Sequence, residues 1–211
     1  MNRRITEPMF AEIDTGLAGF RLWPAALSPE AQAALLGEVL AAIDVAPLYR
    51  PVTPGGRKFS VRMTNLGSLG WVSDRQGYRY QPTHPTTGQP WPPIPPVLRE
   101  LWRDLTGEAT VPDACLVNLY GEGARMGLHQ DRDEVDMGAP VLSVSLGDTA
   151  VFRIGEAGAG PTTTIKLASG DICCLMGPAR LARHGIDRVL SGSSRLIPGG
   201  GRLNLTLRRA R

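Results

Sequence analysis

Residues 115–154 read CLVNLYGEGARMGLHQDRDEVDMGAPVLSVSLGDTAVFRI, a stretch in which short apolar runs alternate with Gly, Pro and Asp. The same pattern continues to the end of the chain, and no clear helical periodicity interrupts it. Short apolar runs bounded by turn residues are typical of strands in sandwiches, barrels and jelly rolls. The pattern predicts eight strands, at residues 115–120, 125–131, 141–146, 150–154, 163–167, 171–176, 184–190 and 202–208.

Two helices are expected upstream of these strands. Ser28 and Pro29 form a helix start, with Ser as the N-cap and Pro at the first helical position, and apolar residues follow at helical spacing to about Asp44. A second helix follows Pro95-Pro96 and ends near Gly107. We expect both helices to cover one sheet, which makes the fold α+β and mainly β.

Length and composition limit the class of protein. A chain of 211 residues predicts one domain with a hydrophobic core, and its 25 Gly and 18 Pro favour tight turns. No apolar run approaches the roughly 18 residues of a membrane span, and the early arginines lack the apolar segment of a secretory signal. We therefore expect no membrane partner. Three cysteines, two of them adjacent in an apolar stretch, predict buried free thiols and a cytoplasmic protein.

The basic residues are concentrated in two regions. Of the 23 basic residues 21 are arginines, which favours a phosphate or carboxylate partner, although codon usage alone could produce that excess. Residues 50–80 carry a net charge of +5 together with Trp71, Tyr78 and Tyr80. Such a segment is typical of a surface that stacks on bases and binds phosphates, but it could also be a flap packed on the core. Residues 180–211 hold eight arginines and one acid, which indicates either phosphate contacts or a solvated basic tail.

The three histidines are His84, His129 and His184. Within a strand over 125–131, the side chains of His129 and Asp131 would point to the same face and could reach one ion. His184, on a later strand, could supply a third ligand. Two imidazoles and one carboxylate form the facial triad that suits non-haem Fe(II) and leaves coordination positions open. An H-x-D pair alone is weak support, because surface loops often contain one.

The last predicted strand, 202–208, alternates strictly between apolar and polar residues. Its polar face carries two arginines with an Asn between them, an arrangement that can bind both ends of a small dicarboxylate. Asn118 and Tyr120 share one face of strand 115–120 and can donate hydrogen bonds to a carboxylate. The alternatives are an edge strand with a wet polar face, and a strand that carries one amphipathic Tyr.

Together these residues resemble the AlkB family of 2-oxoglutarate-dependent iron(II) dioxygenases. The motifs occur in order over residues 60–210: Met63-Thr64-Asn65, Leu69-Gly70-Trp71, Arg75 to Tyr80, Pro90-Trp91-Pro92, Asn118-Leu119-Tyr120, His129 to Glu134, His184-Gly185 and Arg202 to Arg208. The resemblance implies a double-stranded β-helix, or jelly roll, with N-terminal helices covering one sheet and a nucleotide-recognition lid. Within one domain, 1–211, it implies a helical extension at 1–49, the lid at 50–94, and a helix with the catalytic jelly-roll core at 95–211.

The resemblance also implies roles for single residues. The iron ligands and catalytic residues would be His129, Asp131 and His184. Arg202 would pair with the far carboxylate of 2-oxoglutarate, while the other cosubstrate residues would be Asn118, Tyr120, Asn204, Thr206 and Arg208. In the substrate-binding set, Trp71 would stack on the alkylated base and Asp133 would read the base or balance its positive charge. Tyr78, Arg79 and Tyr80 would complete that set near the nucleic-acid backbone.

The activity implied is oxidative demethylation of 1-methyladenine and 3-methylcytosine in DNA, with RNA as a further substrate. Fe(II) would be the metal, and 2-oxoglutarate and O2 would be converted to succinate and CO2 as formaldehyde leaves. Because the methyl group must reach the iron, the nucleotide must leave the base stack, which favours single-stranded over double-stranded DNA. We expect a monomer.

A bacterial member of the family carries a basic residue just after the strand that ends here at Ile154, whereas this chain reads GEAGAG over residues 155–160. This difference bears on the affinity for the nucleic-acid substrate. Two other interpretations remain open at the level of sequence. One is an iron- and 2-oxoglutarate-dependent hydroxylase that acts on a protein side chain or a small molecule. The other is a non-catalytic nucleic-acid-binding jelly roll.

Overall fold

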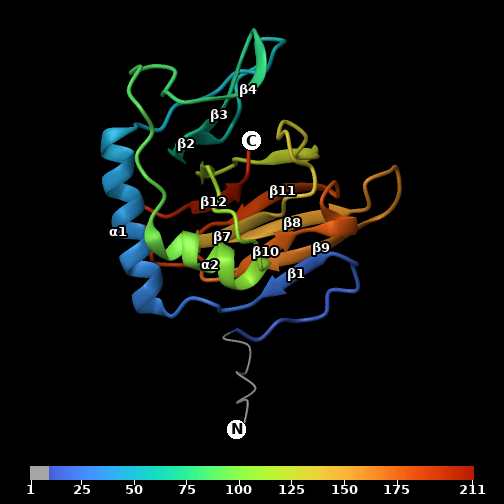
Figure 1. The fold of residues 1–211 in the computed structure, drawn as a ribbon. Coiled ribbons are helices and arrows are strands. Elements are labelled where there is room, and N and C mark those ends of the chain that lie inside the picture. The colour runs from blue at the N-terminus through green and yellow to red at the C-terminus, as the bar shows by residue number, and fades with distance from the viewer. Residues whose placement is uncertain (1–9) are drawn as a thin grey trace, which may run out of the picture.

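The protein is described here by a computed structural model that covers residues 10–211. Two antiparallel sheets form its core (Figure 1). The six-stranded sheet has the order β1 (Phe20–Trp23), β10 (Ile172–Leu175), β7 (Val141–Gly147), β12 (Arg202–Arg208), β5 (Ala114–Tyr120) and β2 (Arg62–Gly67). The four-stranded sheet has the order β6 (Met126–His129), β11 (Arg183–Leu190), β8 (Thr149–Gly155) and β9 (Thr162–Leu167).

The two sheets face each other across an apolar interior. Residues of both sheets share one buried cluster, with Phe20, Leu116 and Leu175 from one sheet and Phe152 and Ile186 from the other. All strand pairs are antiparallel, as in a jelly roll. A hydrophobic interior between two sheets contributes roughly 25 cal/mol for each Å² of apolar surface removed from water. The predicted fold class, mainly β with a jelly-roll core, is confirmed.

The predicted helices are also confirmed. Helix α1 (Pro29–Val45) begins after Ser28, whose hydroxyl accepts the Ala31 N–H at 3.2 Å. Helix α2 (Pro96–Thr106) ends at Gly107, which adopts the left-handed conformation with φ of 74° that glycine tolerates best. Buried residues of both helices share a second cluster with strands of the six-stranded sheet, on the face turned away from the jelly-roll interior. The helices therefore cover the outside of that sheet.

All eight predicted strands exist, as β5 to β12, with one informative difference in length. The strand expected over 125–131 ends at His129, so Asp131 lies beyond the strand. The prediction that His129 and Asp131 lie on one strand is therefore wrong, and alternation along a strand does not bring the two side chains together. The polar alternation of β12 is right, but β12 pairs with both β7 and β5 and is not an edge strand.

Four strands had not been predicted. Strand β1 lies in the range 1–49 and pairs with β10, while β2 lies in the range 50–94 and pairs with β5. Strands β3 (Gly70–Asp74) and β4 (Gly77–Gln81) form a two-stranded hairpin at the top of Figure 1, which pairs with neither sheet but contacts β2 and β5 through β3. Because β2 belongs to the main sheet, the separate part of the range 50–94 is centred on the hairpin β3–β4.

Two smaller predictions concern the chain as a whole. Cys115, Cys173 and Cys174 are free and buried, as expected. Among the described residues no helix is long and apolar enough to span a membrane. The N-terminal stretch 1–9, on which the absence of a secretory signal was predicted, lies outside the described residues.

Candidate active site

A cavity of about 390 Å³ opens between the two sheets. Its wall combines the polar face of β12, the facing side of β5, the segment after β6, the start of β11 and part of the hairpin β3–β4. Most of the residues singled out in the sequence line it: Trp71, Tyr78, Asn118, Tyr120, His129, Asp131, Asp133, His184, Arg202, Asn204, Thr206 and Arg208. Arg79 and Tyr80 are not part of this wall.

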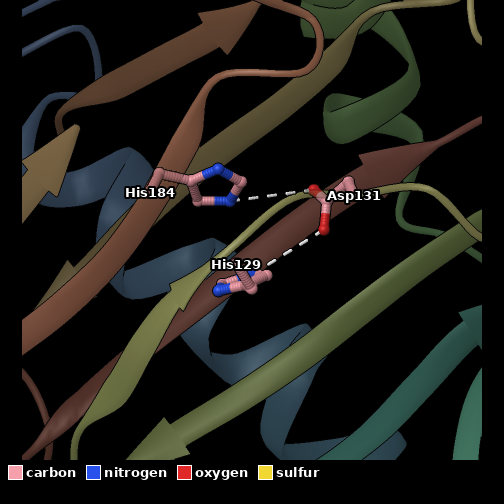
Figure 2. Close-up of side chains that lie close together, drawn as sticks. All are labelled: His129, Asp131 and His184. Carbon is pink, nitrogen blue, oxygen red and sulfur yellow. Dashed lines mark ion pairs between the residues drawn. The ribbon is translucent and has the colours of Figure 1, made fainter. Parts of the chain in front are cut away.

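The side chains of His129, Asp131 and His184 point toward one another, as Figure 2 shows, and all three line the cavity. His129 and His184 are register partners on β6 and β11, and their ring centroids are 4.5 Å apart. The His129 Nε2 lies 3.8 Å from Asp131 Oδ1, and the His184 Nε2 lies 3.9 Å from Asp131 Oδ2. One ligand atom from each residue fits within 4.8 Å of the others. These distances match three donors that share one ion.

The backbone fixes which imidazole nitrogen faces the centre. The Nδ1 of His129 lies 2.9 Å from the Gly127 carbonyl oxygen, and the Nδ1 of His184 lies 2.9 Å from the Ala182 carbonyl oxygen. A carbonyl oxygen only accepts, so each Nδ1 carries the hydrogen and each Nε2 presents a lone pair. Metal-binding histidines are oriented by this kind of outer hydrogen bond. The two Nε2 lone pairs and the Asp131 carboxylate are a donor set that fits Fe(II).

Electrostatics keep these donors ready for a cation. Burial alone would raise the pKa of Asp131, but Arg208 and the two imidazoles outweigh it, so the pKa lies well below its usual range. Burial lowers the pKa of His184 to about 4, because the negative charge of Asp131 raises this pKa by less than burial lowers it. At neutral pH the carboxyl group is therefore ionised and the His184 imidazole is neutral, which are the forms that bind metal.

The segment after His129 is held by two side chains rather than by a strand. Arg180 is buried, and its guanidinium donates to the Asp131 carbonyl at 2.9 Å and to the Ala139 carbonyl at 2.6 Å. The Gln130 amide donates to the carbonyls of Leu181 and Ala157. These contacts place Asp131 beside the histidines although the chain has left the sheet.

Arg202 stands at the inner end of the cavity with 1% of its surface exposed. Its Nη2 donates to Ser145 Oγ at 2.8 Å and to Asn204 Oδ1 at 3.0 Å, while its Nε and Nη1 have no partner among the described residues. Burial lowers its pKa, and within residues 10–211 no carboxylate lies at ion-pair distance from it. A buried guanidinium with two unsatisfied N–H groups fits an incoming carboxylate, and the cavity between it and the triad fits a small dicarboxylate.

Other polar groups line the path from Arg202 to the triad. The Arg202 guanidinium lies 5.8 Å from the Tyr120 ring centroid, and burial raises the Tyr120 pKa to about 12, so its hydroxyl remains a donor. Asn204 donates to Thr206 Oγ1 at 2.7 Å. The Asn118 Oδ1 is buried and has no hydrogen-bond partner in the part of the chain that the structure describes. All of these residues thus surround the space that a cosubstrate would fill.

The hairpin β3–β4 contributes the mouth of the cavity. The rings of Trp71 and Tyr78 stack with centroids 5.5 Å apart, and Phe59 meets Trp71 edge-on. The indole Nε1 of Trp71 donates to Asp133 Oδ2 at 2.6 Å. Two flat aromatic rings and one carboxylate therefore lie together at the mouth.

Arg79 and Tyr80 face other partners. The Arg79 guanidinium pairs with Asp74 at 2.8 Å, and the Tyr80 hydroxyl donates to Glu134 Oε1 at 2.5 Å.

The third histidine, His84, forms hydrogen bonds outside the cavity. It is buried, with its Nε2 2.8 Å from the Pro47 carbonyl and its Nδ1 accepting from the Thr86 and Thr87 amides. His84 therefore fixes the loop that follows the hairpin.

Most arginines of the region 180–211 have structural partners. Arg180, Arg202 and Arg208 are buried. Arg183 donates to the carbonyls of Glu156 and Gly160, so a basic side chain from β11 reaches the loop 155–160 that lacks one of its own. This region is thus largely built into the jelly roll and is not a solvated tail.

Sequence reasoning assigned no role to Glu134, Arg180 or Ser145. All three are buried polar residues whose neighbours come from distant parts of the chain. The one signal for Glu134 was its place in the motif His129 to Glu134, where it follows the residues assigned to iron and base. No local pattern singled out Arg180 or Ser145.

A jelly roll that holds two imidazoles and a carboxylate beside a buried arginine defines a non-haem iron oxygenase that uses a dicarboxylate cosubstrate. Residues 19–208 match the family model described as 2OG-Fe(II) oxygenase superfamily. The alpha-ketoglutarate-dependent dioxygenase AlkB homolog of Caulobacter vibrioides is 60% identical over 204 residues, which cover 96% of this chain and 93% of that protein. The alpha-ketoglutarate-dependent dioxygenase AlkB of Escherichia coli is 43% identical over 175 residues, covering 79% and 81%.

Among solved structures, that of OsALKBH1 superimposes with a TM-score of 0.78 at 30% identity and covers 90% of this chain and 96% of that chain. The chain belongs to the AlkB family within the 2OG-Fe(II) oxygenase superfamily. It is a dioxygenase that uses Fe(II), 2-oxoglutarate and O2, and the interpretation as a non-catalytic binding protein is set aside.

Proposed function

We propose that this dioxygenase removes methyl groups from the ring nitrogens of nucleobases in DNA, with 1-methyladenine and 3-methylcytosine as substrates and RNA as a further one. The observation that carries the proposal is the mouth of the cavity, where Trp71, Tyr78 and Asp133 lie together and open onto the triad. Two flat rings and a carboxylate suit a flat, cationic base. In support, a human relative is named a nucleic acid dioxygenase.

Within this function, His129, Asp131 and His184 would hold the iron. Arg202 would receive the far carboxylate of 2-oxoglutarate, with Tyr120, Asn204 and Thr206 beside it, while Asn118 and Arg208 would lie near the other carboxylate. When bound, iron and cosubstrate supply an oxidant strong enough to break the C–H bond of the methyl group, which acid or base chemistry alone cannot do. The hydroxylated methyl group then leaves as formaldehyde, while 2-oxoglutarate and O2 end as succinate and CO2.

The protein's own part is to orient the base. Trp71 provides the stacking surface, and its N–H fixes one oxygen of the Asp133 carboxylate. The other oxygen of Asp133 is then available for the exocyclic amine of adenine or cytosine, and its charge compensates the cation that N-methylation creates. Tyr78, Arg79 and Tyr80 belong to the same hairpin, where Tyr78 lies at the cavity and the other two support the hairpin.

To enter a cavity between two sheets, the nucleotide must leave the base stack, so we propose single-stranded DNA as the preferred partner. We also propose that the protein acts as a monomer. We further propose the division into an extension at 1–49, a lid at 50–94 and a core at 95–211. A cytoplasmic location suits the three free thiols.

The direct test is repair of a single-stranded oligonucleotide that carries 1-methyladenine, with Fe(II), 2-oxoglutarate and air, scored by formaldehyde and by the restored base. Asp131→Ala is the matched control and is expected to be inactive. Equal repair by both proteins would contradict the ligand assignment. Succinate formation on a protein or small molecule, without repair of any oligonucleotide, would instead favour the alternative hydroxylase.

A further inference from the structure

A buried group of charged side chains connects the hairpin β3–β4 to the triad. At its centre is the carboxylate of Glu134, whose side chain is 2% exposed. Tyr80, on β4, donates its hydroxyl to Glu134 Oε1 at 2.5 Å. Arg180 donates to Glu134 Oε2 at 3.0 Å, and the Arg208 Nε lies 3.3 Å from Oε1. Glu134 is therefore held by one group from the hairpin and by two arginines from the core.

The same two arginines also hold Asp131. The Nη2 of Arg208 lies 2.9 Å from Asp131 Oδ2, and Arg180 donates to the Asp131 carbonyl at 2.9 Å. Each guanidinium thus bridges Glu134 to Asp131, one through the side chain and the other through the backbone. Any change at Glu134 reaches Asp131 by two separate routes.

We propose that Glu134 is a positioning residue that couples docking of the hairpin β3–β4 to the divalent-metal affinity of His129, Asp131 and His184. The inference rests on the ligand set of the proposed function. Two guanidinium groups, those of Arg180 and Arg208, lie beside Asp131, and both would repel an incoming dication. The Glu134 carboxylate neutralises one of these two positive charges. The Tyr80 hydroxyl keeps the Glu134 carboxylate in this place through a charge-assisted hydrogen bond.

The coupling must act in both directions, because linkage between two binding equilibria is reciprocal. A docked hairpin strengthens metal binding, and a bound metal strengthens hairpin docking by the same factor. The enzyme would thus hold the rings of Trp71 and Tyr78 at the cavity most firmly when the metal is in place. Loading of the metal would then prepare the mouth of the cavity for a base.

The test measures Mn(II) binding to the metal-free protein by electron paramagnetic resonance, which does not depend on turnover. Glu134→Gln keeps the shape of the side chain and removes its charge, and we expect Mn(II) binding to weaken about tenfold, the low end of effects seen for outer-shell partners of a metal ligand. Tyr80→Phe removes only the hydroxyl, and we expect a loss of about fivefold. Tyr49→Phe is the matched control, because its buried hydroxyl has no hydrogen-bond partner within residues 10–211, and should leave the affinity unchanged.

A double variant separates coupling from general damage. If Tyr80 acts through Glu134, Tyr80→Phe causes no further loss of affinity in the Glu134→Gln background. A purely structural role would lower the melting temperature and leave Mn(II) affinity unchanged. If Glu134→Gln fails to fold because two buried arginines lose a partner, the Mn(II) affinity of Tyr80→Phe still tests the proposed coupling.

The reciprocal effect can be measured by trypsin cleavage at Arg75 and Arg79 in the hairpin. Mn(II) should slow this cleavage in the wild type and slow it less in Tyr80→Phe. Folded Tyr80→Phe with Mn(II) affinity within twofold of the wild type would overturn the inference. His129→Ala distinguishes the two hypotheses: normal Mn(II) binding by that variant would overturn the ligand set itself, whereas its loss, with Tyr80→Phe unchanged, would overturn only the coupling.

Discussion

Replacing Arg202 with methionine should weaken 2-oxoglutarate binding and at the same time stabilise the ligand-free protein. Arg202 is 1% exposed, and its Nε and Nη1 have no partner among the described residues. Each buried N–H left without a partner costs at least about 1 kcal/mol. Methionine fills a similar volume without that cost.

The gain in stability is reduced by what the substitution removes. The Arg202 Nη2 bonds to Ser145 and Asn204 would be lost, which leaves an expected net gain of about 1 kcal/mol. For a domain of this size that corresponds to a rise of about 3 °C in melting temperature. Cosubstrate binding should lose about 3 kcal/mol or more, the cost of removing one partner from a buried ion pair, which is roughly a hundredfold in Kd.

Both effects can be measured without turnover on Mn(II)-loaded and metal-free protein, by calorimetric titration with 2-oxoglutarate and by thermal unfolding. Arg202→Lys is the control, since it keeps the charge but cannot form two parallel hydrogen bonds, and it should fall between the wild type and Arg202→Met in affinity. An affinity within threefold of the wild type in Arg202→Met would refute the carboxylate role. A melting temperature lowered by several degrees would refute the claim that the unpartnered guanidinium destabilises the ligand-free protein.

Three further predictions follow from single contacts. Trp71→Phe keeps a stacking ring but loses the N–H that fixes Asp133, so the ratio of repair rates for 1-methyladenine over the neutral lesion 1-methylguanine should fall roughly tenfold, and an unchanged ratio would exclude this role of the indole. Gly185→Ala would place a Cβ 2.6 Å from the Met126 carbonyl oxygen beside His184, so unfolding free energy should fall by about 1–3 kcal/mol in a denaturant titration and Mn(II) affinity should fall with it; a wild-type titration curve would show that β6 and β11 can move apart. Burial raises the pKa of all three thiols to about 12, so iodoacetamide at pH 8 should label none of them in the native protein and three after unfolding, and rapid native labelling would contradict their burial.

The strands of the jelly roll were predictable because their signal is local. Apolar runs bounded by Gly, Pro and Asp marked β5 to β12, and strict alternation along β12 separated the helix-facing leucines from the cavity face. The hairpin β3–β4 lacks such runs, since most of its residues are polar or aromatic, and only β3, through Gly70, Val72 and Ser73, contributes buried residues. Strand β1 is only four residues long, and its pairing with β10 joins parts of the chain about 150 residues apart.

The site was predictable where its residues are chemically rare and not where they are common. Three histidines in the whole chain limited the choice of imidazole ligands, and the pair of arginines on one strand face stood out. Glu134 and Arg180 did not, because charged residues are usually solvated, and only the tertiary contacts show that these two are buried against each other. The position of Asp131 was anticipated by a strand argument that fails, since Arg180 and the loop hold it.

The charges around the cavity suggest how a repaired base is released. The wall of the cavity contains three arginines, Arg132, Arg202 and Arg208, and three carboxylates, Asp131, Asp133 and Glu134, so the charges of these six groups balance. Fe(II) and the dianion of 2-oxoglutarate add equal and opposite charges and keep that balance. Under the proposed function, a cationic methylated base is attracted by Asp133, but the demethylated base is neutral and loses that attraction. Removal of the methyl group thereby weakens the binding of its own product, so the carboxylate that selects the substrate also favours turnover.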